Sequence, residues 1–150
     1  MSVIPLGSAD RLQVLSICPV FARLPAEHLG VLAEMLQTER LGPGEVLFEH
    51  GDPADRVYLV AGGSLGVFLP GRAGPVRSLG PGQLLGEYGM FSGGARTATV
   101  KAGSEASLLS LDYRRFRAFL LRFPESALAL LQTAAERLLE AEAAAASGGG

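Results

Sequence analysis

The sequence predicts a mainly β protein: an antiparallel β roll, similar to a jelly roll, with short N-terminal helices before it and a long C-terminal helix after it. Between residues 42 and 111, short runs rich in Val, Leu, Phe, Tyr and Thr are separated by Gly and Pro about every eight to twelve residues. Apolar residues recur at helical spacing on both sides of this region. A parallel sheet would need helices between its strands, so the regular turn signals favour an antiparallel roll.

Length and charge are those of one small domain. The chain has 150 residues, with 13 basic and 15 acidic residues and a net charge of −2. The basic residues are scattered along the chain, so the sequence has no electrostatic footprint for nucleic acid. We therefore expect no DNA binding by this chain alone.

Cysteine and histidine usage limits the chemistry. Cys18 is the one cysteine, which excludes an internal disulfide and a cysteine metal cluster and favours a buried structural thiol. His28 falls in a predicted helix and His50 in a turn, so no metal site is predicted. Because no nucleophile–base arrangement is present either, we expect no catalytic residues, no metal, no cofactor and no enzyme activity.

The sequence has no signal-peptide pattern and no apolar run of the roughly 20 residues that a membrane-spanning helix needs. We therefore expect a cytoplasmic location and no membrane partner.

The N-terminal part is predicted to be helical. Residues 1–9 are expected to be a tail, and residues 10–146 one domain whose first section, 10–41, forms two or three short helices. Pro25 suits the first turn of a helix, because the backbone donor that it lacks would be unpaired there in any case. The apolar positions recur three and four residues apart, at Leu12, Leu15, Phe21, Leu24, Leu29, Leu32, Met35 and Leu36.

The β roll is predicted over residues 42–111, beginning at Gly42-Pro43-Gly44. β-Branched and aromatic residues, which are favoured in strands, mark the individual segments. The expected strands are 45–49, 56–61, 64–69, 75–79, 98–102 and 106–111.

The last section, 112–146, is predicted to contain two helices. Asp112 can cap a short helix, and Pro124 can open a second one that continues to Ala146. That second helix would be about 33 Å long at 1.5 Å per residue, which is more than one small roll needs. Its apolar stripe is therefore expected to pack partly against a ligand or another subunit, and residues 147–150 to form a flexible tail. The stripe includes Leu128, Leu131, Ala135 and Leu138.

A glycine-punctuated segment, 86–100, carries the clearest functional signal. Gly86 and Gly89 permit close backbone approach and positive φ, and a short helical turn starting near Glu87 would direct backbone amides at an anion. Arg96 offers a planar guanidinium that can bind two phosphate oxygens. Glu87 is an acceptor-only group that suits a sugar hydroxyl, so the pair indicates a ligand with both phosphate and ribose. The alternative is an ordinary surface ion pair.

The segment resembles the phosphate-binding cassette of the cyclic nucleotide-binding domain family. Here the pattern stands as Leu85-Gly86-Glu87 followed by Arg96-Thr97-Ala98-Thr99-Val100, so the cassette is predicted over residues 85–99. Segments 42–48 and 51–60 resemble the opening strands of the family, and segment 62–67 resembles its next hairpin. The resemblance covers roughly residues 10 to 140.

The resemblance implies roles at the phosphate and sugar end of a ligand, which would be cAMP or cGMP. Arg96 and backbone amides around Gly86 and Ala95 would bind the cyclic phosphate. Glu87 would accept the ribose 2′-hydroxyl. Leu85 replaces the usual aromatic residue before the Gly-Glu pair.

The resemblance also implies contacts near the base. Thr97 would reach the phosphate or the purine edge, or be a plain strand residue, and it is compatible with either nucleotide. Gly89 and Tyr88 complete the binding set, with Tyr88 as a core or wall residue of the cassette. Arg137 best matches the helical residue that covers the base, where it would stack on the purine or pair with Glu87. The alternative is a solvent-facing arginine paired with an acid of its own helix, Glu136 or Glu140.

Together these features predict a regulatory domain that senses a cyclic nucleotide and moves its C-terminal helix to signal to a partner or effector. The alternatives are a dimerisation or protein-interaction module on the same fold, which works without ligand, and the regulatory half of a transcription regulator. Ala141 and Glu142 stand where activators of the family often carry base-contacting hydroxyl residues. The choice of base and a dimer switch of that type therefore stay open.

Overall fold

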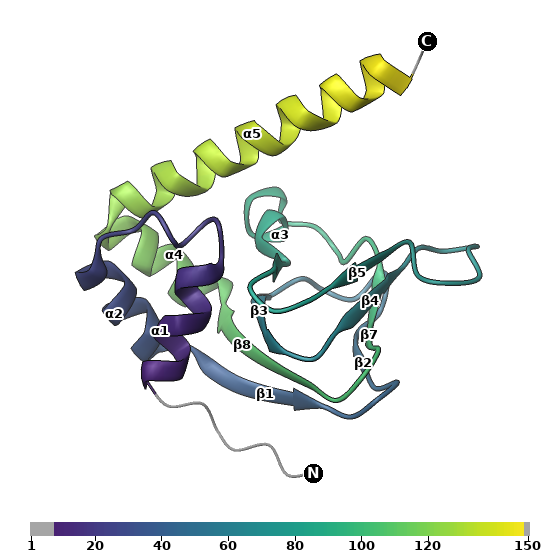
Figure 1. Cartoon of the computed structure of the whole chain (residues 1–150), viewed down its shortest axis with the longest axis horizontal. Helices are drawn as coiled ribbons and strands as arrows, with labels where there is room; N and C mark the ends of the chain where they lie inside the picture. The colour runs from purple at the N-terminus through teal and green to yellow at the C-terminus, as the bar shows by residue number, and fades with distance from the viewer. Residues whose placement is uncertain (1–7, 149–150) are drawn as a thin grey trace.

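The structure, a computed structural model, describes residues 8–148 and confirms the antiparallel β roll with flanking helices (Figure 1). The N-terminal helices lie at one end of the roll, and the last helix runs across the top of the view and ends away from the roll. The elements, in chain order, are α1 (Ser8–Ile17), α2 (Ala26–Met35), β1 (Gln37–Leu41), β2 (Val46–Phe48), β3 (Arg56–Gly62), β4 (Leu65–Phe68), β5 (Arg77–Leu79), β6 (Leu84–Leu85), α3 (Glu87–Ser92), β7 (Thr99–Ala102), β8 (Ala106–Asp112), α4 (Tyr113–Arg122) and α5 (Pro124–Gly148).

Two four-stranded antiparallel sheets form the roll. One has the strand order β1-β8-β3-β6 and the other β2-β7-β4-β5. In the second sheet, Val100 lies opposite both Phe48 and Val67, and Val67 lies opposite Arg77. Directly paired residues share one face of a sheet, so these four side chains form a single row across it.

Strands β3 and β8 are buried on both faces, which divides the core into two parts. Val57 and Leu59 face the helices, whereas Tyr58 and Val60, one position along, face the interior of the roll. This alternation follows from the two-residue period of a strand. The helices α1, α2 and α4 therefore close one face of the first sheet, and the second sheet closes the other.

The prediction that residues 10–41 are helical is wrong for the last five of them. Residues 37–41 form β1, which pairs with β8 from Gln37 opposite Ser110 to Leu41 opposite Ala106. The segment has mixed polar residues and no clear alternation, so the free edge of β8 decides its conformation rather than local preference.

Strand β6 is a second element that the sequence analysis missed. It contains two residues and pairs with β3, with Tyr58 opposite Leu85 and Leu59 opposite Leu84. A strand this short leaves no periodic signal, but it anchors the start of the cassette to the sheet. The remaining strands lie within two residues of their predicted bounds.

The helices extend into both predicted tails, residues 1–9 and 147–150. Helix α1 begins at Ser8, with Asp10 in its first turn, where an acid favours a helix start. Helix α5 continues through Gly148, because the alanine run before it has high helix propensity. Residues 1–7 and 149–150 of those tails lie outside the described residues.

The two helix starts predicted near the C-terminus are confirmed. The carboxylate of Asp112 accepts a hydrogen bond from the backbone amide of Arg115 at 2.7 Å and caps α4. Pro124 opens α5. The face of α5 that packs on the domain is not the leucine stripe, since the buried residues are Ser126, Ala129, Leu130 and Thr133.

Candidate functional site

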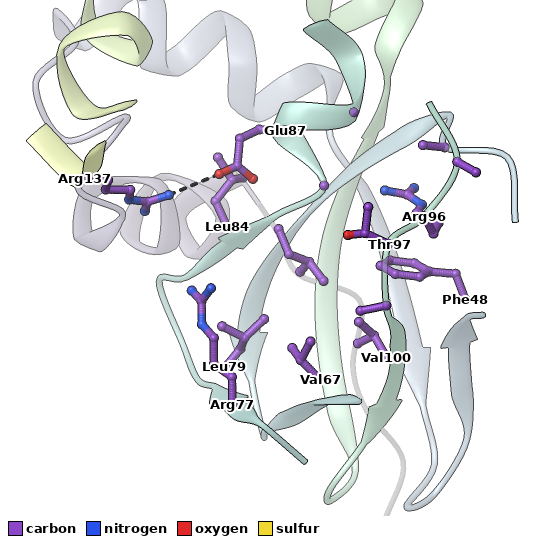
Figure 2. Close-up of a pocket in the computed structure, with 16 residues that line it drawn as sticks. Phe48, Val67, Arg77, Leu79, Leu84, Glu87, Arg96, Thr97, Val100 and Arg137 are labelled. Atoms are coloured by element: carbon purple, nitrogen blue, oxygen red, sulfur yellow. Dashed lines mark hydrogen bonds and ion pairs between the residues drawn. The ribbon is translucent and has the colours of Figure 1, made fainter. Parts of the chain in front are cut away.

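A cavity of about 250 Å³ opens between the second sheet, the cassette and α5 (Figure 2). Its floor is the row of Phe48, Val100, Val67 and Arg77 that crosses the sheet. The rest of the lining comes mainly from the cassette, from β5 and β6 and from α5: Ala54, Leu79, Leu84, Leu85, Gly86, Glu87, Gly89, Ala95, Arg96, Thr97, Ala98 and Arg137.

The cassette begins with a left-handed residue. Gly86 has φ 87° and precedes α3, and a Cβ there would lie 2.7 Å from Nη1 of Arg96. Both the positive φ and this close approach require glycine. The short helical turn that was predicted near Glu87 is α3, which carries Glu87 as its first residue.

Arg96 occupies one end of the cavity and is buried, with 5 % of its side chain exposed. Its Nη2 donates a hydrogen bond to the carbonyl of Arg56 at 2.9 Å, and its guanidinium lies 4.2 Å from the centre of the Phe48 ring. Backbone bonds hold the residue in place, since the Arg96 amide donates to the Asp52 carbonyl.

The charge of Arg96 is only weakly compensated. Its acidic neighbour is Asp55, at 3.8 Å, and the side chain of Asp55 is 78 % exposed. The buried Nε–H of Arg96 has no acceptor among residues 8–148. A buried cation that lacks both a strong counter-ion and one hydrogen-bond acceptor fits a site that receives an anion.

Glu87 lies on the other side of the cavity and is also buried, with 5 % exposure. It accepts a hydrogen bond from Nη1 of Arg137 at 3.1 Å (Figure 2). Arg137 therefore pairs with Glu87, which is one of the predicted arrangements. The pair joins the cassette to α5.

Burial raises the pKa of the Glu87 carboxyl above its ordinary value of 4.5, against the opposing effect of the Arg137 charge and hydrogen bond. A weaker lowering comes from the charge of Arg77. The two arginines thus support the ionised carboxylate, whereas the apolar surroundings favour the protonated form.

A second ion pair fixes α5 one residue away. Nη2 of Arg23, in the turn after α1, donates to both carboxylate oxygens of Glu136 at 3.1 Å. Neighbouring residues of α5 are therefore tied to two different parts of the domain.

The other predicted binding residues have the following positions. Gly89, Ala95 and Thr97 line the cavity, with Ala95 and Thr97 exposed. Tyr88 belongs to α3, but its side chain lies outside the described part of the structure.

Two polar residues that the sequence analysis did not select also belong to the site. Arg77 lies on the edge strand β5 and lines the cavity on the side of Glu87 and Arg137 (Figure 2). Within the described chain its guanidinium has no hydrogen-bond or ion-pair partner. Tyr113, at the start of α4, contacts the cassette from outside the cavity. Arg77 lies two positions before the apolar Leu79 in a predicted strand, so the two side chains share one face, and this was a signal that could have been used.

The comparisons with known proteins show the family and agree with the fold. The sequence matches the cyclic nucleotide-binding domain family over residues 38–123. It is 36 % identical over 125 residues to a cyclic nucleotide-gated potassium channel of Mesorhizobium japonicum, covering 83 % of this chain and 34 % of the channel. It is 32 % identical over 127 residues to the cyclic AMP receptor protein of Thermus thermophilus, covering 83 % of this chain and 59 % of that protein.

Among solved structures, the N-terminal domain of a transcriptional regulator from Streptomyces coelicolor is similar, with a TM-score of 0.76 and 37 % identity. The match covers 87 % of this chain and 94 % of that one. The chain therefore belongs to the cyclic nucleotide-binding domain family. It spans only about a third of the length of the channel relative. Across residues 8–148 the structure contains no helix that combines the length and apolar character needed to cross a membrane.

Proposed function

We propose that this domain is a regulatory sensor of a 3′,5′-cyclic purine nucleotide, cAMP or cGMP. The observation that carries the proposal is the charge arrangement in the cavity. A buried and under-compensated guanidinium, Arg96, lies across the cavity from a buried carboxylate, Glu87. A ligand that has a phosphate at one end and a ribose hydroxyl beside it satisfies both groups at once.

The phosphate is proposed to bind at Arg96, where the free Nε–H supplies a donor. The ribose 2′-hydroxyl then donates to Glu87. Gly86, Gly89 and Ala95 bring backbone close to this end, and Thr97 offers a hydroxyl at the rim.

The base is proposed to extend toward Arg77 and Arg137, on the side of the cavity away from Arg96. Arg137 belongs to α5 and touches Glu87, so a bound base would contact the helix and the sheet together. A ligand can shift α5 only through contacts that differ between two positions of the helix. The Glu87–Arg137 pair is the contact most directly available for such a difference.

The signal is proposed to leave through α5 to an effector or a second copy. Four leucines of this helix are about 60 % exposed: Leu128, Leu131, Leu138 and Leu139. Leu128, Leu131 and Leu138 recur at the three- and seven-residue spacing that faces a partner helix. Their exposure also favours the second candidate function, a dimerisation or interaction module that needs no ligand.

A cytoplasmic location is part of the proposal. Cys18 is a free, buried thiol, which is typical of a reducing compartment.

Isothermal titration with cAMP and with cGMP tests the sensor function. We expect micromolar or tighter binding of at least one of them by the wild-type chain, and loss of that binding in Arg96→Ala with the fold retained by circular dichroism. Gel filtration with and without nucleotide separates the two candidates. A dimer that forms without nucleotide, together with no heat from either titration, would refute the sensor and favour the interaction module.

A further inference from the structure

Tyr113 has contacts at the phosphate end that no cassette residue supplies. Its hydroxyl donates a hydrogen bond to the carbonyl of Gly86, and Nη1 of Arg96 lies 3.4 Å from the same oxygen. A phenol has one proton, which is used on Gly86, so Arg96 is the donor in the second contact. One hydroxyl therefore touches both the first glycine of the cassette and its arginine.

The position of this hydroxyl is set by the backbone around it. Tyr113 is the first residue of α4, next to the capping residue Asp112. Its amide donates to the carbonyl of Asp55 at 2.9 Å, and the carboxylate of Asp55 lies 3.8 Å from Nη2 of Arg96. Tyr113, Asp55 and Arg96 thus each contact the other two.

Gly89 is packed directly against the same hydroxyl. A Cβ at this position would overlap the hydroxyl oxygen of Tyr113, while Cζ of that ring would be 3.4 Å away. The Cβ of Ala54 would be 3.1 Å away. The oxygen atom of Tyr113 is therefore the main reason why residue 89 has no room for a side chain.

Burial raises the pKa of the Tyr113 hydroxyl above its ordinary value of 10.0, so the group is protonated at neutral pH. It can donate to Gly86 under all physiological conditions. Phenylalanine would fill nearly the same volume but leave the Gly86 carbonyl without this donor and Arg96 without this acceptor.

We propose that Tyr113 is a positioning residue for the anion site: its hydroxyl holds Gly86, Gly89 and Arg96 in the arrangement that receives the phosphate. This inference rests on the proposed function, since the anion is taken to be the cyclic phosphate. Tyr113 acts through the cassette and is not placed in contact with the ligand.

Four proteins test the inference: wild type, Tyr113→Phe, Gly89→Ala, and the double variant. Titration with cAMP and cGMP measures affinity, and thermal melting without ligand measures the folded state. We expect Tyr113→Phe to weaken binding about tenfold, the effect of one hydrogen bond, while the fold is kept. Tyr113→Phe should weaken the binding of 2′-deoxy cyclic nucleotides by the same factor. The reason is that Tyr113 acts at the phosphate end of the ligand and not on Glu87, which is proposed to bind the 2′-hydroxyl.

The double variant provides the readout that a general loss of stability would not give. Tyr113→Phe should weaken binding in the wild-type background but restore it in Gly89→Ala, because the oxygen that the new Cβ would overlap is gone. Melting temperatures should show the same restoration. Binding by Tyr113→Phe within twofold of wild type, or a double variant no better than Gly89→Ala in either assay, would overturn the inference.

Failure of the proposed function looks different. If wild type binds neither nucleotide, the sensor assignment is refuted, and melting of the four ligand-free proteins still decides whether Tyr113 shapes the cassette. A double variant that melts above Gly89→Ala supports the contact, and equal melting temperatures reject it.

Discussion

Replacing Arg137 by Met removes the cation next to a carboxylate that the fold has buried, while the apolar stem of the side chain is largely kept. The Glu87 side chain is 6 % exposed and Arg137 is 40 % exposed, with 3.1 Å between the paired atoms. Breaking a fully buried pair costs about 3–5 kcal/mol and an exposed one less than about 1 kcal/mol. For this intermediate pair we expect a loss of about 2 kcal/mol.

An upper limit follows from the titration of Glu87. The unpaired carboxylate can take up a proton, and doing so at pH 7 from the ordinary pKa of 4.5 costs about 3.4 kcal/mol. The part of the loss that comes from leaving Glu87 unpaired cannot exceed this value at pH 7, and this limit falls toward zero as the pH approaches 4.5. At about 2–4 °C per kcal/mol for a domain of this size, the melting temperature at pH 7 should fall by about 4–8 °C.

The pH dependence has a definite sign. Because the pKa of Glu87 is raised in the folded state, the folded chain holds more protons than the unfolded chain above pH 4.5. The contribution of Glu87 to stability is therefore greatest below pH 4.5 and is lost as the pH rises through the folded pKa. Without Arg137 that pKa rises further, so the difference between wild type and Arg137→Met should shrink from pH 7 to pH 5.

Arg23→Met is the matched control, because Arg23 pairs with the neighbouring residue of the same helix. The Arg23 and Glu136 side chains are 46 % and 54 % exposed, so breaking this pair should cost less than about 1 kcal/mol. Urea unfolding of the three proteins at pH 5 and pH 7 measures the free energies. Equal losses for the two variants, or a loss for Arg137→Met that does not change with pH, would refute the reasoning.

Four further predictions concern the ligand and the helix. Nucleotide affinity should fall as the pH is lowered, because the ribose hydroxyl donates to the ionised form of Glu87. Calorimetric titration in two buffers that differ in ionisation enthalpy should detect the proton released on binding. Glu87→Gln should abolish the pH dependence. Arg77→Met should lower the ratio of cGMP to cAMP affinity in a competition assay, since guanine presents O6 and N7 acceptors to a guanidinium; an unchanged ratio contradicts this. Gly86→Ala should lower the melting temperature and weaken binding, because φ is 87° and Arg96 lies 2.7 Å from the new Cβ. If α5 pairs with a second copy, Leu131→Glu with Leu138→Glu should give monomers by sedimentation that keep a folded circular dichroism spectrum, since both side chains are exposed on the single chain.

Local residue chemistry was enough to predict much of the architecture. Glycine and proline turns separate the strands of the roll, and each turn signal acts on its own few residues. Asp112 caps α4 and Pro124 opens α5 for reasons that do not depend on the rest of the fold. The position of Glu87 at the start of a short turn is equally local, because Gly86 adopts the left-handed conformation that precedes it.

Pairing across the chain decided what local patterns could not. Strand β1 exists because β8 offers it a free edge, and the two residues of β6 are ordered by β3. Arg77 and Tyr113 lie outside the cassette in sequence and carry no motif. They reach the site because the register of β4 and β5 turns Arg77 into the roll and the start of α4 brings Tyr113 against Gly86.

The sequence by itself determined the turns, the caps and the cassette residues, since each depends on the conformational preferences of a few neighbouring positions. Only the tertiary structure decided which face of α5 is buried and which residue neutralises Glu87. The leucine stripe of α5 is exposed, and Ala129, Leu130 and Thr133 are buried in its place. A helix buries the face that fits its neighbours, and a buried carboxylate takes the cation that the packing brings within reach, as Arg137 shows.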